Sequence, residues 1–253
     1  MPVEQPWKKL EIALLLCFVI VHGVIYNAVG KVAASRGLDF GEQVTIGLDL
    51  RVPEIPLMVI PYMLAWLYPV MLLVGLLRAG TPGVIAIRRI LASFVVLELL
   101  CYSIWILFPV RVSLRMDEVV LASHGWLGDV VSKNYELTSP WNACPSFHVA
   151  GPWLFFRAVQ LYRIPFQRSL LVLFADIALS TVTIRIHYLV DIVVGLVVAE
   201  LAFQLILLPL ERKQTFGRHS SSAAVVSYTA LLCLATCGYV LLTVIKHSMH
   251  ILV

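Results

Sequence analysis

Charged side chains are scarce in this chain. Only 13% of the 253 residues are Asp, Glu, Lys or Arg, whereas 60% are hydrophobic, and the mean hydropathy is +0.90. Soluble domains carry roughly 25% charged residues, so this composition excludes an ordinary soluble domain. The formal net charge of +4 is small. We attribute it to the excess of Lys and Arg that membrane proteins carry in the connections on one side of the membrane, so we expect no nucleic-acid partner.

Cysteine is also scarce. Four of the five cysteines fall inside apolar runs, where cysteine usually behaves as a small hydrophobic residue: Cys17, Cys101, Cys233 and Cys237. Cys144 lies outside the runs and has no obvious partner, and no cysteine or histidine spacing typical of a zinc site occurs. We therefore predict no disulfide framework, no metal and no cofactor.

The apolar residues gather in seven runs that we interpret as membrane-spanning helices. They cover approximately residues 10–29, 57–77, 90–108, 147–162, 170–186, 188–208 and 223–245. The first run, at about 20 residues, is longer than the 7 to 15 residues of a signal-peptide core, so we interpret it as a retained span. The prediction is an all-α polytopic membrane bundle, with a core of six spans and a seventh, C-terminal span in a single transmembrane domain (1–253).

Lys and Arg are distributed unevenly between the connections. If the N-terminus is cytoplasmic, the short inner connections hold most of them: Lys8, Lys9, Arg78, Arg88, Arg89, Arg163, Arg168, Arg212, Lys213 and Arg218. The positive-inside rule favours this orientation. It predicts a cytoplasmic N-terminus and places the segments around residues 145 and 187 on the extracytoplasmic or lumenal side.

The outer connection between residues 109 and 145 carries apolar residues at helical spacing, from Val119 to Val131, interleaved with acidic residues. This pattern is typical of a helix lying at the membrane interface, with Trp126 at the level of the headgroups. An ordinary exposed loop helix explains the pattern equally well.

Two histidines and a carboxylate form the most informative pattern. His148 follows Pro145-Ser146-Phe147, and His187 lies four residues before Asp191. The two apolar stretches between the histidines predict a helical pair that returns the chain to the same membrane face, and four-residue spacing on a helix brings His187 within reach of Asp191.

These residue types suit phosphoester chemistry. Ser146 is a good N-cap, and the N-terminus of the helix that it begins favours a phosphate. His148 could give a proton to a leaving oxygen, and His187, oriented by Asp191, could attack phosphorus. For the negative oxygens we consider three arginines: Arg111, Arg115 and Arg185. Two histidines and a carboxylate could instead hold a metal ion.

At these residues the chain resembles the type 2 phosphatidic acid phosphatase superfamily, and more finely its inositol phosphorylceramide synthase and sphingomyelin synthase branch. The shared features are Asp49–Pro56 before an apolar span, Phe108-Pro109-Val110, the segment 140–150 with Asn142 and Pro-Ser-x-His, and His187 with Asp191. The resemblance covers roughly residues 48–198, and it gives an enzymatic core of about 48–209.

The resemblance implies that His187 becomes transiently phosphorylated, that Asp191 supports it and that His148 serves as acid and base. It adds Asp49, Asn142 and Ser146 to the arginines as expected substrate-binding residues. The chain departs from the wider superfamily at Thr181, where an arginine is usual, at Phe147, where glycine is usual, and in lacking the Lys and Arg-Pro motif.

We therefore expect a lipid phosphotransferase that passes a phospho-headgroup from a membrane lipid to an alcohol or lipid acceptor. With water as acceptor the same site is a lipid or polyprenyl phosphate phosphatase. A remoter alternative is a proton-coupled transporter that uses Glu98, Asp176 and Glu200 within the apolar runs, but we find no internal repeat of the kind that transporters show. The sequence leaves the oligomeric state open.

Overall fold

The computed structural model describes residues 6–65, 67–78, 81–164 and 167–216, and these residues form helices and connections with no β-strand. The long helices are α1 (Pro6–Ser35), α5 (Thr81–Leu107), α8 (Phe147–Leu161), α9 (Gln167–Thr183) and α10 (Leu189–Ala202). α10 continues through a π-helical turn (Phe203–Leu207) into α11 (Leu208–Phe216). The all-α prediction is confirmed for this part of the chain.

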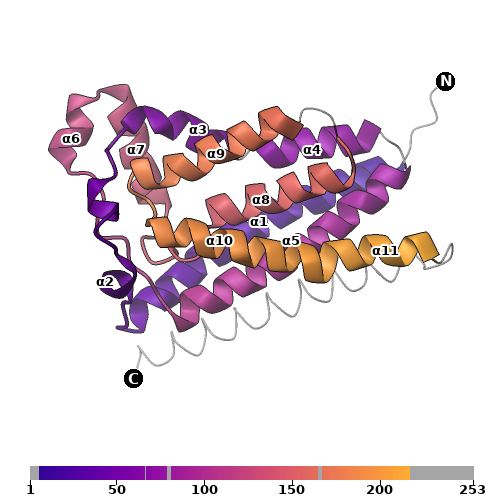
Figure 1. The fold of residues 1–253 in the computed structure, drawn as a ribbon, viewed down its shortest axis with the longest axis horizontal. Coiled ribbons are helices and arrows are strands. Elements are labelled where there is room, and N and C mark those ends of the chain that lie inside the picture. The colour runs from indigo at the N-terminus through magenta and orange to yellow at the C-terminus, as the bar shows by residue number, and fades with distance from the viewer. Residues whose placement is uncertain (1–5, 66, 79–80, 165–166, 217–253) are drawn as a thin grey trace.

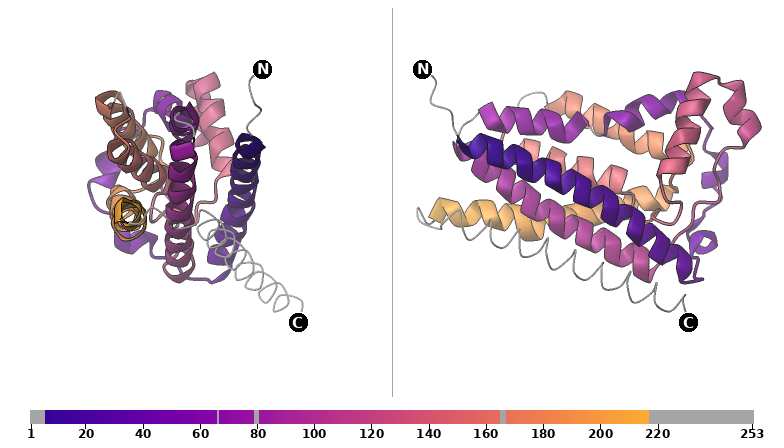
Figure 2. Two further views of the ribbon diagram at one scale, coloured as in Figure 1. Left: turned by 90° about the vertical axis from the view of Figure 1, so that its right-hand side faces the viewer. Right: turned by 180° about the vertical axis from the view of Figure 1, so that it is seen from behind.

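The long helices run side by side, and shorter elements gather at one end of them (Figure 1). The short elements there are α2 (Gly41–Val44), two 3₁₀ turns (Asp49–Arg51 and Pro56–Met58), α6 (Glu118–Ser123) and α7 (Trp126–Leu137). α1 lies along α5, as the rear view in Figure 2 shows, and α8 packs between α9 and α10.

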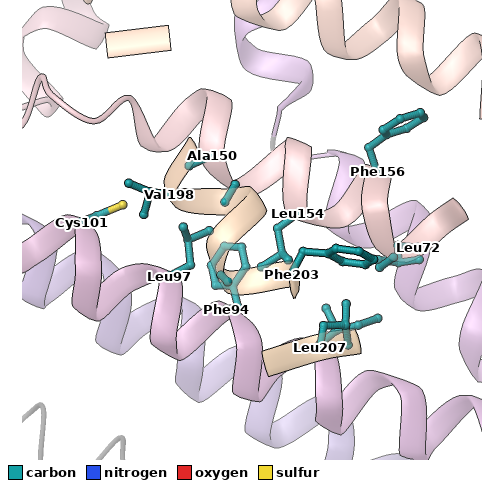
Figure 3. Packing of buried hydrophobic residues seen from close by; sticks show 14 of the residues in the cluster. Leu72, Phe94, Leu97, Cys101, Ala150, Leu154, Phe156, Val198, Phe203 and Leu207 are labelled. Carbon is teal, nitrogen blue, oxygen red and sulfur yellow. The ribbon is translucent and has the colours of Figure 1, made fainter. Parts of the chain in front are cut away.

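Apolar side chains from α5, α8 and α10 form the core. Leu97, Leu154 and Ala199 are completely buried within it, and Figure 3 shows how the core side chains of these helices converge. At the end far from the short elements, Glu211 of α11 pairs with Arg89 of α5 and accepts a hydrogen bond of 3.0 Å from the Tyr162 hydroxyl after α8. This polar contact joins three helices.

Several predicted boundaries differ from the structure. The run at 57–77 is divided into α3 (Val59–Leu64) and α4 (Leu67–Arg78), and α5 begins nine residues before the run at 90–108. The expected interfacial helix is two helices, α6 and α7, because Gly125 between them adopts a left-handed φ of 54°, which interrupts a helix and suits glycine.

Two helices are long and apolar enough to cross a membrane by length and composition: Pro82–Leu107 and Leu189–Arg212. The count of six spans plus one stays a prediction. The run at 223–245 lies outside the described residues.

Candidate active site

His187 and Asp191 form a buried pair. The His187 Nδ1 lies 3.2 Å from the Asp191 Oδ2, and this oxygen also accepts a hydrogen bond of 2.9 Å from the Tyr188 main-chain N–H. Asp191 is completely buried and His187 is 6% exposed. The predicted contact therefore forms, although His187 precedes α10 instead of lying on it. The carboxylate fixes the ring through Nδ1 and leaves Nε2 on the opposite side for chemistry.

The end of α9 holds His187 in place. The Thr181 carbonyl accepts hydrogen bonds from the main-chain N–H groups of Ile186 (3.0 Å) and His187 (3.1 Å). Arg185 has a left-handed φ of 56°, so the chain reverses directly after the helix, as at many helix C-termini. This turn presents His187 at the start of α10.

α8 begins beside this turn. Its N-cap is Ser146, whose main-chain N–H donates to the Asp191 carbonyl at 3.1 Å. A Cβ added to Gly195 of α10 would lie 2.8 Å from the Ser146 carbonyl oxygen, so only glycine permits this approach. The Trp105 Nε1 donates to the Pro145 carbonyl at 3.1 Å. α10 and α5 thus fix the start of α8.

The structure brings the two histidines together. The ring centroids of His148 and His187 are 6.0 Å apart. His148 also stacks against Tyr62 of α3, with centroids 4.4 Å apart and an interplanar angle of 29°, and the Tyr62 hydroxyl lies 3.5 Å from the His148 Nδ1. The site therefore contains two adjacent imidazoles, one supported by a carboxylate and the other by a phenol.

A cavity of about 310 Å³ opens beside His148. Along α8 its wall is formed by Phe147, His148, Gly151, Pro152 and Phe155, which follow one face of the helix. At a rise of about 1.5 Å per residue, this wall extends about 12 Å from its first to its last residue. The remaining wall comes from α1, α3, α4, α5 and α7, and the described lining contains no Lys or Arg.

Asp49 and Arg185 hold the backbone around His187. The Asp49 Oδ1 accepts a hydrogen bond of 2.8 Å from the N–H of Leu189, which starts α10. The Arg185 guanidinium donates to the carbonyls of Asp49 (2.6 Å) and Val52 (2.7 Å) and lies 3.4 Å from the Glu54 carboxylate. Neither side chain is among the described residues that line the cavity, so their contacts are those of positioning residues.

The other two arginines differ in their surroundings. Arg115 donates to the carbonyls of Tyr135 (2.8 Å) and Thr138 (3.0 Å) at the end of α7, and burial lowers the pKa of its guanidinium. Arg111 is exposed, and its guanidinium lies 5.7 Å from the centre of the Trp141 ring. Within the described chain, no hydrogen bond or ion pair of the Arg111 side chain is found.

Apart from the arginines, three of the predicted site residues keep a polar atom that is buried without a hydrogen-bond partner in the described chain. The Asn142 Nδ2 donates to the Tyr26 carbonyl at 2.8 Å, whereas its Oδ1 is buried without a hydrogen-bond partner among the described residues. The Ser146 Oγ and the Asp191 Oδ1 are likewise buried without a hydrogen-bond partner in the part of the chain that the structure describes. Unpaired buried polar atoms are unusual and often mark functional sites.

Two of the three carboxylates of the transporter alternative lie close to a basic side chain. Glu98 pairs with His22 at 2.5 Å, and Glu200 pairs with Arg157 at 3.2 Å. Asp176 is exposed on α9. Among the described residues, no group of three or more His, Cys, Asp or Glu side chains is arranged to hold a metal ion.

Sequence reasoning missed three residues at this site. Tyr62 and Trp105 lie within apolar runs and carried no local signal. Cys144 is buried close to Asp191, and burial, followed by the negative charge of Asp191, raises the pKa of its thiol. Its position in the sequence, two residues before Ser146, was the one feature that could have indicated that Cys144 lies near the site.

One of three comparisons with known proteins found a match. A family model described as the PAP2 superfamily matches residues 34–205. The matched range contains all three residues of the imidazole and carboxylate cluster. Searches of curated proteins and of solved structures found no match.

Proposed function

Because the chain belongs to the PAP2 superfamily, which comprises the type 2 phosphatidic acid phosphatases and related enzymes, we propose that it is an integral-membrane lipid phosphotransferase. The reaction cleaves a lipid phosphoester through a covalent phosphohistidine and passes the phospho group to an acceptor alcohol. The observation that carries this proposal is the 6.0 Å separation of the His148 and His187 rings, combined with the Asp191 contact to His187.

In the first step the His187 Nε2 attacks phosphorus, and the bond between phosphorus and the lipid alcohol oxygen breaks. His148 gives its proton to that oxygen. The ring of His187 becomes positively charged as it is phosphorylated, and the buried Asp191 carboxylate stabilises this charge. In the second step His148 takes the proton of the acceptor hydroxyl, whose oxygen attacks phosphorus and releases His187.

The phosphate oxygens need positive partners. The first turn of α8 presents main-chain N–H groups and the positive end of the helix dipole, next to the unpaired Ser146 Oγ. Arg111 is the arginine best suited to add a charge, because Arg115 and Arg185 already donate to main-chain carbonyls. We assign Arg111 to the headgroup side of the substrate.

Membership of the inositol phosphorylceramide and sphingomyelin synthase-like branch would make the acceptor a lipid alcohol. The motifs around Asp49–Pro56 and Pro-Ser-Phe-His support this choice. The aromatic wall of the cavity supports it as well, since a pocket that excludes water favours transfer over hydrolysis. With water as acceptor, the same residues would carry out phosphatase chemistry.

The proposal places the site on the extracytoplasmic or lumenal side, with the N-terminus in the cytoplasm. The distribution of Lys and Arg in the connections supports this orientation. The two apolar helices, Pro82–Leu107 and Leu189–Arg212, support insertion in a membrane.

The first experiment tests the nucleophile. Purified protein is incubated with lipids labelled in the phosphate, quenched in alkali and examined for acid-labile label on the protein. Wild type should retain label, and His187→Ala should retain none and lose at least about 10³-fold in turnover. His124→Ala is the control, because His124 is an exposed histidine on the cap of α6. Turnover of His187→Ala within tenfold of wild type would refute the assignment.

The second experiment identifies the acceptor. The protein is incubated with phospholipids and polyprenyl phosphates, with and without inositol, diacylglycerol and ceramide. A transferase produces a new phospholipid only when the acceptor is present. Release of free phosphate or free phospho-headgroup at a rate that no acceptor changes would identify a phosphatase.

A further inference from the structure

Gly151 lies in the middle of the cavity wall that α8 forms. Along this wall Phe147 lies about one turn before it and Phe155 about one turn after it. Phe94 of α5 contacts both of these rings, with its ring centroid 5.4 Å from that of Phe147 and 5.0 Å from that of Phe155. All four residues line the cavity, so Gly151 is the place where the aromatic wall has no side chain.

Close packing does not require a glycine at this position. A Cβ added to Gly151 would lie 3.5 Å from the Phe94 Cε2 and Cζ atoms, which is an ordinary contact, whereas one added to Gly195 would lie 2.8 Å from a main-chain oxygen. Alanine would therefore fit at 151, and it favours a helix interior over glycine. The space that the missing side chain leaves in the cavity gives this glycine a use.

The size and surface of the cavity suit one hydrocarbon chain. Since an apolar cavity of about 150 Å³ holds one benzene ring, a cavity of about 310 Å³ has room for about ten to twelve carbon atoms. Its wall is mostly apolar, and it extends along α8 from His148 to Phe155. A chain that starts at the phosphoester beside His148 would therefore pass Gly151 on its way along the wall.

We propose that the cavity holds one hydrocarbon chain of the lipid alcohol and that Gly151 sets the length of chain that fits. A larger side chain at 151 must extend past the Phe94 ring or displace it. Because both residues line the cavity, either outcome shortens the space for the chain. This inference rests on the proposed function, because it takes the lipid whose phosphoester is cleaved as the occupant of the cavity.

The test measures binding of butyl-, hexyl-, octyl-, decyl- and dodecylphosphonate, which cannot be cleaved, to protein in lipid nanodiscs. Comparing each variant with wild type at one chain length cancels the partitioning of the probe into the bilayer. Each methylene that an apolar site accepts raises affinity about fourfold. In Gly151→Leu, butylphosphonate should bind within about twofold of wild type, and decylphosphonate at least about tenfold more weakly.

Gly151→Ala is the matched control, because its methyl group fits beside Phe94, and it should bind every probe within about twofold of wild type. Phe155→Ala enlarges the far end of the cavity and should bind dodecylphosphonate more tightly than wild type. A loss in folded Gly151→Leu that is equal at all chain lengths would overturn the inference. If that variant does not fold, the absence of a gain in Phe155→Ala would overturn it.

Turnover of the matching alkyl phosphates separates this inference from the proposed function. If the binding profile shifts as expected and no alkyl phosphate is cleaved with or without an acceptor, the proposed function fails and the Gly151 assignment stands. If the phosphates are cleaved and folded Gly151→Leu keeps the chain-length profile of wild type, the proposed function stands and the Gly151 assignment fails.

Discussion

Replacing Asp191 by Asn separates the charge of this side chain from its shape. The amide oxygen can take the place of Oδ2 and keep the hydrogen bonds from the Tyr188 N–H and from His187. The amide NH₂ then takes the place of Oδ1, which is buried and has no hydrogen-bond partner among the described residues. Both proteins thus have one unpaired polar atom there, but the hydrogen bonds to Oδ2 lose a charged acceptor. Hydrogen bonds to charged groups contribute about 1.5 to 3 kcal/mol and neutral ones about 0.5 to 1.5 kcal/mol, so the thermal unfolding midpoint should fall by several degrees.

The larger effect should be on turnover. The substitution removes the negative charge that stabilises the phosphorylated His187 ring, and loss of an orienting carboxylate lowers kcat by on the order of 10³- to 10⁴-fold in hydrolases that use one. KM should change less than about threefold, because the proposed phosphate contacts come from main-chain N–H groups and Arg111.

The assay compares kcat and KM for headgroup release in detergent, together with the unfolding midpoint. Asp49→Asn is the control, because Asp49 also accepts main-chain hydrogen bonds beside His187 but is not hydrogen-bonded to its ring. It should be destabilised and keep kcat within about tenfold. If Asp191→Asn keeps kcat within tenfold while Asp49→Asn does not, the reasoning on charge stabilisation is refuted.

Two further substitution and labelling experiments test the packing and the topology. Gly195→Ala should lower both stability and turnover by pushing α10 away from α8, because the added Cβ would lie 2.8 Å from the Ser146 carbonyl oxygen. Gly75→Ala is the control and should leave both unchanged, because nothing lies within 4 Å of a Cβ added there. Equal effects of the two substitutions would contradict this packing argument. In a cysteine-free background, a cysteine at Asp129 should react with an impermeant maleimide in intact cells or sealed vesicles, and one at Arg212 only after permeabilisation. The reverse pattern would place the site in the cytoplasm.

The sequence was most informative where one residue type has few structural uses. The spacing of His187 and Asp191 predicted their contact, and the apolar stretches between the histidines predicted the helical pair that brings His148 to the same end of the bundle. Composition predicted a membrane protein, and two described helices are long and apolar enough to cross a membrane. These predictions needed only local periodicity and element length.

The sequence was less informative where the outcome depends on distant main-chain atoms. Arg185 and Arg115 were candidates for binding phosphate, and in the structure both donate to main-chain carbonyl oxygens. Hydrophobic periodicity does not indicate where a carbonyl group from another segment will lie. The same holds for Tyr62 against His148. Its role depends on how α3 packs, which an apolar run does not encode.

The hydrogen bond from the Ser146 main-chain N–H to the main-chain carbonyl of Asp191 couples the positions of the two segments that carry the histidines. Asp191 thus contacts His187 through its side chain and holds the start of α8, which carries His148, through its main-chain carbonyl. We therefore expect a shift of either segment to displace the other, and we expect insertions or deletions near residue 146 or residue 191 to be tolerated only in compensating combinations. The other ends of α8 and α9 lie far from this hydrogen bond, so we expect related sequences to vary in length first between these two helices.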